Sequence, residues 1–501
     1  MLISVNSSTF FPYYFIYFLK ASFMKNHRSS ITYCIALIIS LFIGSSLSAQ
    51  TLTTSNRTID QAFDIAIRTI DKNTTPEGII LAGGAYGGEW TRDCAINSIN
   101  ALNLLRPQVA ENSLWSVTND RRSVGHQYWD KIIWVIAAWE HYMVTNDENY
   151  LRQIYQCART TFAELEAQHY NAQYGLFMGP AVFQDGIAGY DEPVYQKGNE
   201  STYVLDHDAD RIMCLSTNCI YYKAYDCIAA MAWKLGITGE IYNSKAKSLK
   251  KAIRKHFYNS KTNSLCYYID QNGTKHQYTE ALGVAFATLY ELVSKKEAQK
   301  IIRNVYSSKY GVPVVYPSFP RYSESKPGRH NVMVWPHVNM FFAWACAYVD
   351  EIDRYYAEIT NLAQLVKSSG GFYEIYDPTT GKPSGGWQCG RLWDPLPDQT
   401  WCATGYVGQI LYGVFGVKIT PLGLRFRPLG MPNGKECTLR GIPFHGHNIN
   451  LTVRGNGKGE APKSVTINGE KGTNFVDYDG GVFINGRYKV INGDINIVIQ
   501  L

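Results

Sequence analysis

The chain has 501 residues, of which 46% are hydrophobic and 18% are charged, and its formal net charge is +6. This composition excludes a disordered chain, and the length is enough for one large domain and a smaller one, each with its own core. The basic residues are scattered, and the densest cluster, residues 247–257, has the spacing of a solvated helix face, so we expect no nucleic-acid partner.

The amino-terminal segment has the layout of a secretory signal peptide. From Met24 a basic start is followed by an apolar run, residues 31–43, and by a stretch of small residues that ends at residue 49. We therefore predict a signal peptide within residues 1–49, with Met24 as the true start and export to the periplasm or the medium. A two-pass membrane anchor is the alternative, but neither apolar run is a clean span, so no stable membrane span is expected.

Helical patterns recur at steady intervals through most of the chain. Helices that are apolar all round alternate with amphipathic, charged ones, which predicts an inner ring of buried helices wrapped by an outer ring. The fold class is therefore predicted as mainly α, an (α/α)6 toroid whose twelfth helix is missed or irregular; a superhelical solenoid is the alternative, but repeats of fixed length are absent. The predicted helices cover residues 59–72, 92–105, 128–144, 148–169, 217–235, 240–257, 278–293, 296–307, 334–349, 351–368 and 401–415.

The pattern changes after Phe415. From Leu422 onward, short alternating segments such as LGLRFRPL, NINLTVRG and DINIVIQL are separated by Asn-Gly and Gly-Lys turns, as in antiparallel strands. We predict a catalytic domain over residues 50–417 and a small carboxy-terminal β-sandwich domain over residues 418–501 that packs against the toroid.

Loops at one end of an inner ring converge on a central pocket, and three of them carry candidate functional residues. In GGAYGGEWTRD, the side chains of Trp90, Arg92 and Asp93 suit a polyhydroxy ligand, although an Asp at a helix start is often only a cap. The 36 tyrosines and 11 tryptophans of the chain suit either a large aromatic core or surfaces that stack on sugar rings.

The second and third loops each carry a carboxylate. Asp185, in VFQDGIAGY, lies between an apolar approach and a glycine-rich turn, a setting that desolvates a carboxyl group and raises its pKa, as a general acid requires. An ordinary Asp-Gly turn is the alternative, and Asp191 and Glu192 are nearby substitutes. Glu374, in YEIYDPTTG, is the second carboxylate, with a structural ion pair as its alternative role.

Two carboxylates on either side of a sugar bond are the minimum machinery of glycoside hydrolysis. In the inverting reaction one carboxyl group protonates the leaving oxygen and the other activates water, with the two groups ~6.5 to 9.5 Å apart. Facing loops of a toroid can bring Asp185 and Glu374 together despite their separation in sequence.

Other polar motifs carry less weight. The run DHDAD at residues 206–210 alternates oxygen ligands as a calcium loop does, but it lacks the glycine and glutamate that complete such a loop. The cysteines have no zinc-site spacing and most lie in apolar helical contexts, so we expect buried hydrophobic side chains and no metal site. His126 and His330 are either pocket residues or ordinary polar loop residues.

Several motifs together resemble the six-hairpin glycosidases, most of all the group of mannosyl-oligosaccharide glucosidase and mannosylglycerate hydrolase, with trehalase and amylo-α-1,6-glucosidase more distant. The resemblance covers residues 58–501 and is carried by EWTRD, YWDKIIWVIAAWEHY, VWPHVNMFFAWA, GGFYEIYDPTTGKP and WCATGYVGQILYGVFG. It implies an inverting, exo-acting hydrolase of α-linked glucosides or mannosides, without a cofactor and with an oligosaccharide or glycoside as its partner.

The resemblance also implies roles for individual residues. Glu374 matches the family's base motif, and Asp185 matches its acid by position and order. Contact with the sugar is implied for Trp90, Arg92, Asp93, Trp129, Asp130, Trp335 and His337. A disaccharide phosphorylase of related fold and a non-catalytic glycan-binding protein remain as alternatives, and a carboxylate at position 374 argues against the phosphorylase.

Overall fold

The computed structural model describes residues 50–501 except residues 89, 126–128, 192–210, 458–460 and 489–492. The predicted signal peptide, His126, Glu192 and the run at residues 206–210 lie outside the described residues.

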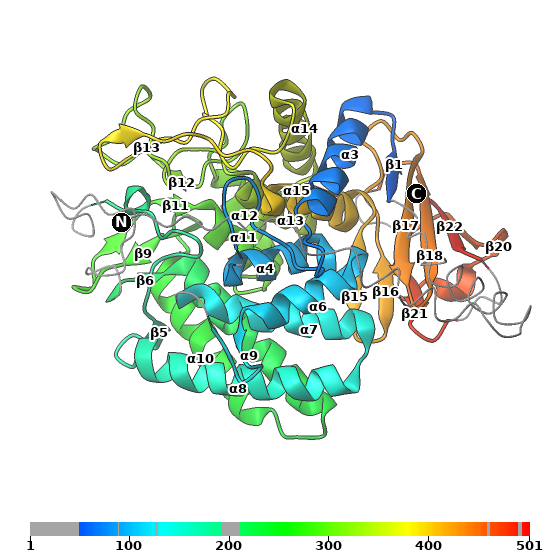
Figure 1. The fold of residues 1–501 in the computed structure, drawn as a ribbon, viewed down its shortest axis with the longest axis horizontal. Helices are drawn as coiled ribbons and strands as arrows, with labels where there is room; N and C mark the ends of the chain where they lie inside the picture. The colour runs from blue at the N-terminus through cyan, green and yellow to red at the C-terminus, as the bar shows by residue number, and fades with distance from the viewer. Residues whose placement is uncertain (1–49, 89, 126–128, 192–210, 458–460, 489–492) are drawn as a thin grey trace, which may run out of the picture. The chain divides into compact units, whose positions relative to one another are not determined.

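In the described part of the chain, the main helices form six pairs, each with one helix in an outer ring and one in an inner ring, and they are labelled in Figure 1. The outer helices are α3 (Arg57–Lys72), α6 (Pro107–Ser116), α8 (Glu148–His169), α10 (Glu240–Phe257), α12 (Lys295–Asn304) and α14 (Ile352–Ser369). The inner helices are α4 (Thr91–Asn97), α7 (Ile133–Thr145), α9 (Leu215–Lys234), α11 (Ala281–Leu289), α13 (Pro336–Tyr348) and α15 (Thr400–Gln409). Helix α4 continues through η1 (Ser98–Leu102) into α5 (Asn103–Leu105), and α15 continues into η5 (Ile410–Val414).

The inner ring is closed. Going round it, α4 contacts α7, and contacts then follow between α7 and α9, α9 and α11, α11 and α13, α13 and α15, and α15 and α4. The last contact is close because Gly408 of α15 lies against the backbone of η1, where an added Cβ would stand 2.5 Å from the carbonyl oxygen of Asn100. This closed ring confirms the predicted (α/α)6 toroid.

The two kinds of helix differ in burial as their sequences predict. In α15 all ten residues are buried, because this helix is covered on every side. In the outer helix α10 the buried residues are Ala246, Leu249, Ile253 and Phe257, which recur every three or four positions along one stripe. The lysines at 247, 251 and 255 are exposed, so the basic cluster lies on a solvated face.

The sequence pattern missed α6. This helix begins with a proline at its first position, and its buried residues are Ala110, Ser113, Leu114 and Trp115. Two of the four are small or polar, so the apolar stripe that marks an amphipathic helix is too weak to see in the sequence.

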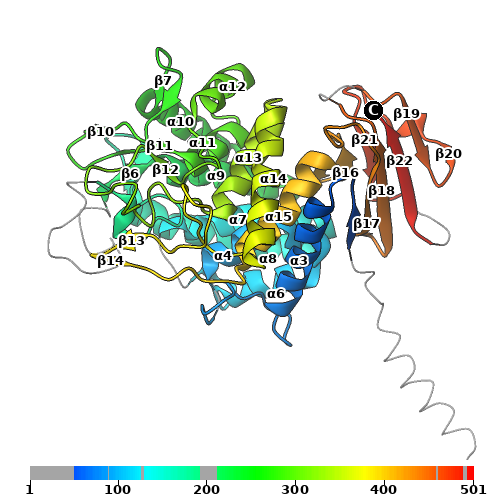
Figure 2. The ribbon, with the colours of Figure 1, turned by 90° about the horizontal axis from the view of Figure 1, so that it is seen from above.

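The carboxy-terminal strands form two sheets beside the helices, as Figure 1 and the view from above in Figure 2 show. One sheet has three strands in the order β15-β16-β21 and the other has six in the order β1-β17-β18-β22-β19-β20. The predicted carboxy-terminal β region is thus confirmed. Its strands are β15 (Val417–Thr420), β16 (Gly423–Phe426), β17 (Cys437–Phe444), β18 (His447–Arg454), β19 (Ser464–Ile467), β20 (Glu470–Lys471), β21 (Val482–Asn485) and β22 (Ile495–Gln500).

One strand of the larger sheet comes from the other end of the described chain. β1 (Thr51–Thr53) pairs with β17 in antiparallel register, with Thr51 opposite Arg440. The side chain of Gln50 adds a hydrogen bond of 2.8 Å to the carbonyl oxygen of Gly441. No pattern in the sequence indicates this strand, and the boundary at residues 417 and 418 stays a prediction.

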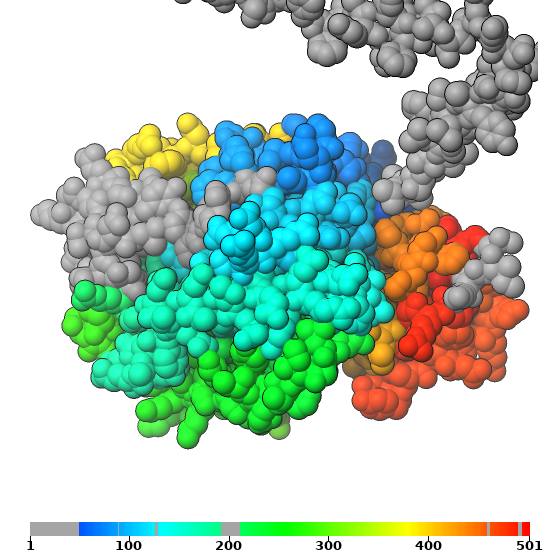
Figure 3. Space-filling view, turned by 60° about the horizontal axis from the view of Figure 1, so that its bottom comes forward, coloured from blue at the N-terminus to red at the C-terminus, as the bar shows by residue number. Residues whose placement is uncertain are grey.

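Segments coloured from cyan to green, which include the outer helices α8 and α10, cover much of the face shown in the space-filling view (Figure 3). Within the described part of the chain, no helix is both long enough and apolar enough to span a bilayer. The cysteines from Cys94 to Cys437 are buried except for Cys389, which is partly exposed, so the prediction that they act mainly as small core residues is confirmed.

Candidate active site

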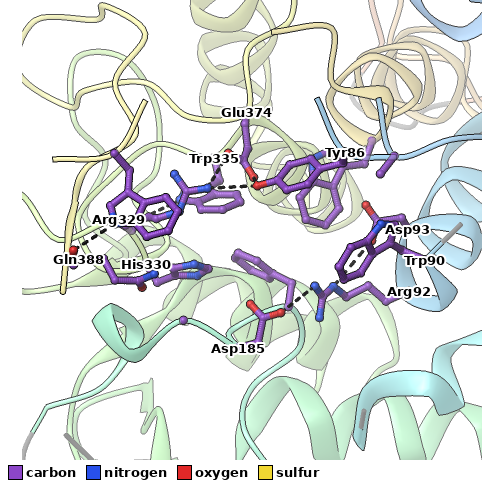
Figure 4. Close-up of a pocket in the computed structure, with 15 residues that line it drawn as sticks. Tyr86, Trp90, Arg92, Asp93, Asp185, Arg329, His330, Trp335, Glu374 and Gln388 are labelled. Carbon is purple, nitrogen blue, oxygen red and sulfur yellow. Dashed lines mark hydrogen bonds and ion pairs between the residues drawn. The ribbon is translucent and has the colours of Figure 1, made fainter. Parts of the chain in front are cut away.

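Four loops that each lead from an outer helix into the next inner helix meet around one cavity of about 220 Å³ (Figure 4). They precede α4, α9, α13 and α15, so the closed ring places segments from distant parts of the chain at one end of the toroid. The lining residues are Ala82, Tyr86, Trp90, Arg92, Asp93, Phe183, Asp185, Gly186, Arg329, His330, Trp335, Glu374, Gln388, Trp393 and Trp401.

Glu374 enters the cavity from the loop before α15 and is held by two donors. Its Oε1 accepts a hydrogen bond of 2.9 Å from the hydroxyl group of Tyr86, and its Oε2 pairs with Nη2 of Arg329 at 2.7 Å. Burial and the charge of Glu374 raise the pKa of Tyr86, so this phenol stays protonated and remains a donor. Glu374 is therefore an ion-pair partner and a cavity residue at once, and each of its oxygens keeps a further acceptor position.

Arg329 is itself fixed on several sides. Its Nη1 donates to the carbonyl oxygen of Gly385 at 2.9 Å, and its guanidinium lies over the rings of Trp335 and Trp393, 5.3 and 5.6 Å from their centroids. A rigid arginine of this kind fixes the orientation of the Glu374 carboxylate.

Asp185 lies across the cavity from Glu374, as Figure 4 shows, and is bound to Arg92. Nη2 of Arg92 is 3.0 Å from Oδ2 of Asp185, and Nη1 is 3.4 Å from Oδ2 of Asp130. Asp130 is fully buried, and the same oxygen accepts a hydrogen bond of 3.1 Å from the backbone amide of Phe183. Arg92 and Asp130 thus hold the loop that carries Asp185.

Among the described residues, Asp93 is the third carboxyl group that lines the cavity. Burial raises its pKa from the usual 3.8 to about 7, since Arg92 offsets only part of the desolvation and the charges of Asp185 and Asp130 add to the rise. The folded protein therefore keeps a proton on Asp93 over a pH range in which the unfolded chain has released it.

Replacing Asp93 by asparagine should flatten the pH dependence of stability. In the wild type, the raised pKa of Asp93 contributes stability that is complete below about pH 4 and is lost as the pH rises through about 7, on the order of 4 kcal/mol in all. The asparagine side chain has no proton to lose. Urea denaturation at about pH 4 and about pH 8 measures the free energy of unfolding of both proteins.

The matched control is Asp64→Asn, because Asp64 is exposed on the outer helix α3. We expect D64N to keep the wild-type pH dependence. An equal loss of stability with rising pH in D93N and the wild type would show that folding does not raise the pKa of Asp93.

Three residues predicted to contact the sugar lie behind the cavity wall instead of lining it. Trp129 and Asp130 are 2% and 0% exposed, and the indole of Trp129 donates to the carbonyl oxygen of Ala181 at 3.3 Å. His337 is fully buried and stacks on Trp401 with 4.0 Å between the ring centroids. These side chains support residues that do line the cavity.

The substitutes for Asp185 are not cavity residues among those described. Asp191 pairs with Nδ1 of His276 at 3.0 Å and accepts a hydrogen bond from the hydroxyl group of Tyr268, and it does not line the cavity. Glu192 lies outside the described residues. In the described ranges, no cluster of three or more His, Cys, Asp or Glu side chains has the arrangement of a metal site.

The sequence reasoning missed Tyr86, Arg329, Gln388, Trp393 and Trp401 as cavity residues. For Tyr86 a signal was present, because it stands between the glycine pairs of GGAYGG, four positions before the predicted Trp90. For Arg329 and Gln388 there was none, since both stand in polar loops without a distinctive pattern.

Comparison with known proteins identifies the family and the fold of the chain. The family described as "Mannosylglycerate hydrolase MGH1-like glycoside hydrolase domain" matches residues 103–401, more than half of the chain. No curated protein sequence matches the chain significantly.

Solved structures show the same fold at low sequence identity. A sialidase superposes with a TM-score of 0.64 at 16% identity, over 84% of this chain and 40% of that one, so the chain spans less than half of that protein. The GH63 mannosylglycerate hydrolase from Thermus thermophilus in complex with glucose gives 0.56 at 13% identity, over 69% of this chain and 98% of that one. The GH78 family rhamnosidase of a Bacillus species gives 0.52 at 14% identity, over 81% and 42%. The family model matches most of the helical ring, and the solved enzymes have the same fold. The chain therefore belongs to the MGH1-like glycoside hydrolase family and is a glycoside hydrolase.

Proposed function

We propose that the protein is an inverting, exo-acting glycoside hydrolase that cleaves α-linked glucosides or mannosides and needs no cofactor. Asp185 is the general acid and Glu374 the general base. The observation that carries this proposal is the position of the two carboxyl groups on opposite walls of one cavity.

In the proposed reaction both carboxyl groups act on the same sugar. Asp185, protonated when the substrate is bound, gives its proton to the glycosidic oxygen as the bond from that oxygen to the anomeric carbon breaks, and Arg92 then stabilises the carboxylate that forms. Glu374 takes a proton from a water molecule, whose oxygen bonds to the anomeric carbon from the opposite face. Arg329 and Tyr86 support the base role, because two donors favour the ionised form of Glu374, which a base requires.

The rest of the cavity supports a single terminal sugar as the substrate unit. Its volume of about 220 Å³ is below the roughly 300–1,000 Å³ of pockets for drug-sized ligands. Trp90, Trp335, Trp393 and Trp401 give it aromatic walls against which the apolar face of a sugar ring can stack.

A disaccharide phosphorylase is less well supported. Phosphate needs a cationic site, and the two arginines among the described lining residues are each paired with a carboxylate, Arg92 with Asp185 and Arg329 with Glu374. A glycan-binding protein would need the aromatic walls but no facing pair of carboxylates.

The purified mature chain should hydrolyse a nitrophenyl α-glucoside or α-mannoside from a panel of nitrophenyl glycosides and α-linked disaccharides. Proton NMR of the first product should show the β-anomer, since inversion of an α-linkage gives β. An α-anomer would overturn the inverting mechanism, preference for a rhamnoside would overturn the substrate, and turnover that requires phosphate would identify a phosphorylase. Binding of sugars without turnover would identify a glycan-binding protein.

We also propose that the protein is exported, because its amino-terminal segment has the layout of a secretory signal peptide. A hydrolase with such a leader acts in the periplasm or outside the cell, on oligosaccharides or glycosides that it meets there.

A further inference from the structure

His330 lines the cavity but takes no part in the proposed proton transfers. It stands in the loop before α13, is 5% exposed, and packs near Trp335 and Phe183, with 4.9 and 5.9 Å between ring centroids. Figure 4 shows its ring extending from the wall toward the middle of the cavity, on the side that carries Asp185.

The buried amide of Gln184 fixes which ring nitrogen of His330 carries the hydrogen. Nε2 of Gln184 donates to the backbone carbonyl oxygen of His330 at 3.4 Å, which turns its Oε1 toward Nδ1 of the ring, 2.9 Å away. An amide oxygen can only accept, so Nδ1 holds the hydrogen and Nε2 has a free lone pair.

The ring is also uncharged. Burial, together with the positive charges of Arg329 and Arg92, lowers the pKa of His330 well below its usual value. A neutral imidazole with hydrogen on Nδ1 presents Nε2 purely as an acceptor. Among the described residues, no group donates a hydrogen bond to Nε2.

Nε2 lies beside the loop of the proposed acid. A Cβ added to Gly186, the residue after Asp185, would stand 2.4 Å from Nε2 of His330 and 2.6 Å from Oε1 of Gln388. Only glycine at this position lets the ring, Gln388 and the Asp185 loop pack together.

We propose that His330 determines substrate specificity, with its Nε2 accepting a hydrogen bond from one hydroxyl group of the sugar beside Asp185. This inference rests on the proposed function. It restricts the substrate to sugars with a hydroxyl donor at that position, because a deoxy sugar would leave a buried acceptor without a donor.

The test combines a substitution at His330 with removal of single hydroxyl groups from the substrate. In H330N the asparagine Nδ2 replaces Nδ1 as the donor to Gln184, and the acceptor at Nε2 is lost. We expect kcat/KM for the best nitrophenyl glycoside to fall about 10- to 100-fold, as for one buried hydrogen bond left unmade. For one monodeoxy analogue of that glycoside, wild type and H330N should have nearly equal kcat/KM.

H330Q provides the complementary variant, because the glutamine amide reaches the position of Nε2 with its oxygen. It should keep more of the discrimination against that deoxy analogue than H330N does. The matched control is H447N, since His447 lies partly exposed in the β region, away from the lining residues. If H330N lowers kcat/KM by the same factor for every deoxy analogue, His330 contacts no hydroxyl and the inference is wrong.

A binding measurement tests the role of His330 without depending on hydrolysis. Isothermal titration of free glucose, mannose and their monodeoxy analogues into wild type and H330N measures the hydrogen bond without turnover. Hydroxyl-dependent loss of affinity in H330N would uphold the role of His330 even if no glycoside is hydrolysed. Equal affinities of both proteins for all of these sugars would overturn it, whatever the catalytic result.

Discussion

Replacing Glu374 by glutamine should abolish hydrolysis and leave sugar binding nearly unchanged. Glutamine has the shape of glutamate and can still accept from Arg329, but its amide cannot take a proton from water. A positioned general base contributes about 10²- to 10⁴-fold to the rate, so kcat should fall by at least about 100-fold. Steady-state kinetics on the best substrate of the panel, with isothermal titration of its sugar product, measures both quantities.

The matched control for this change is Glu436→Gln. Glu436 is an exposed residue of the β region that pairs with Arg454 at 2.7 Å and does not line the cavity. E436Q should have wild-type kinetics. Unchanged turnover in E374Q would sink the assignment of the base, whereas loss of both turnover and sugar binding would indicate a damaged cavity.

Replacing Asp185 by asparagine should produce a loss that depends on the leaving group. Without the acid, a sugar leaving group departs as a poor alkoxide, and kcat/KM should fall about 10²- to 10⁴-fold. A dinitrophenol or fluoride leaving group needs little protonation, so glycosides of these groups should lose far less. Comparison of kcat/KM over a series of aryl glycosides, disaccharides and glycosyl fluorides checks this dependence.

Asp93 supplies the control that isolates the acid. It lines the same cavity and its pKa of about 7 lets its carboxyl group keep a proton near neutral pH, so its burial and protonation alone would also suit an acid. D93N should weaken hydrolysis of all leaving groups by a similar factor. A strong leaving-group dependence in D93N and none in D185N would transfer the acid role to Asp93.

The architecture could be predicted because it depends on features that each helix shows by itself. A helix covered on every side, such as α15, needs apolar or small residues at most positions, whereas α10 needs them only along one stripe. The exception is α6, whose short buried face includes Ala110 and Ser113. Strand β1 was missed because three residues carry no usable period.

The two carboxylates could be identified as candidates, but their surroundings could not. Glu374 is bound by Tyr86, 288 positions away, and Asp185 by Arg92, 93 positions away, and no local pattern reports such distances. The same lack of a local pattern explains why Trp129, Asp130 and His337 were predicted to contact the sugar although they lie behind the cavity wall. The sequence around an aromatic or polar residue at the start of an inner helix is the same whether its side chain lines the cavity or supports a neighbour that does.

Closure of the inner ring has a consequence for how the chain folds during synthesis. Helix α15 completes the circle by packing against α4 and α3, so the segments that meet come from opposite ends of the helical region. Until that late segment is made, the growing chain holds an open arc with apolar faces exposed to solvent. The contact between Tyr86 and Glu374 forms only when the arc closes. The proposed active site is therefore complete only in the closed ring.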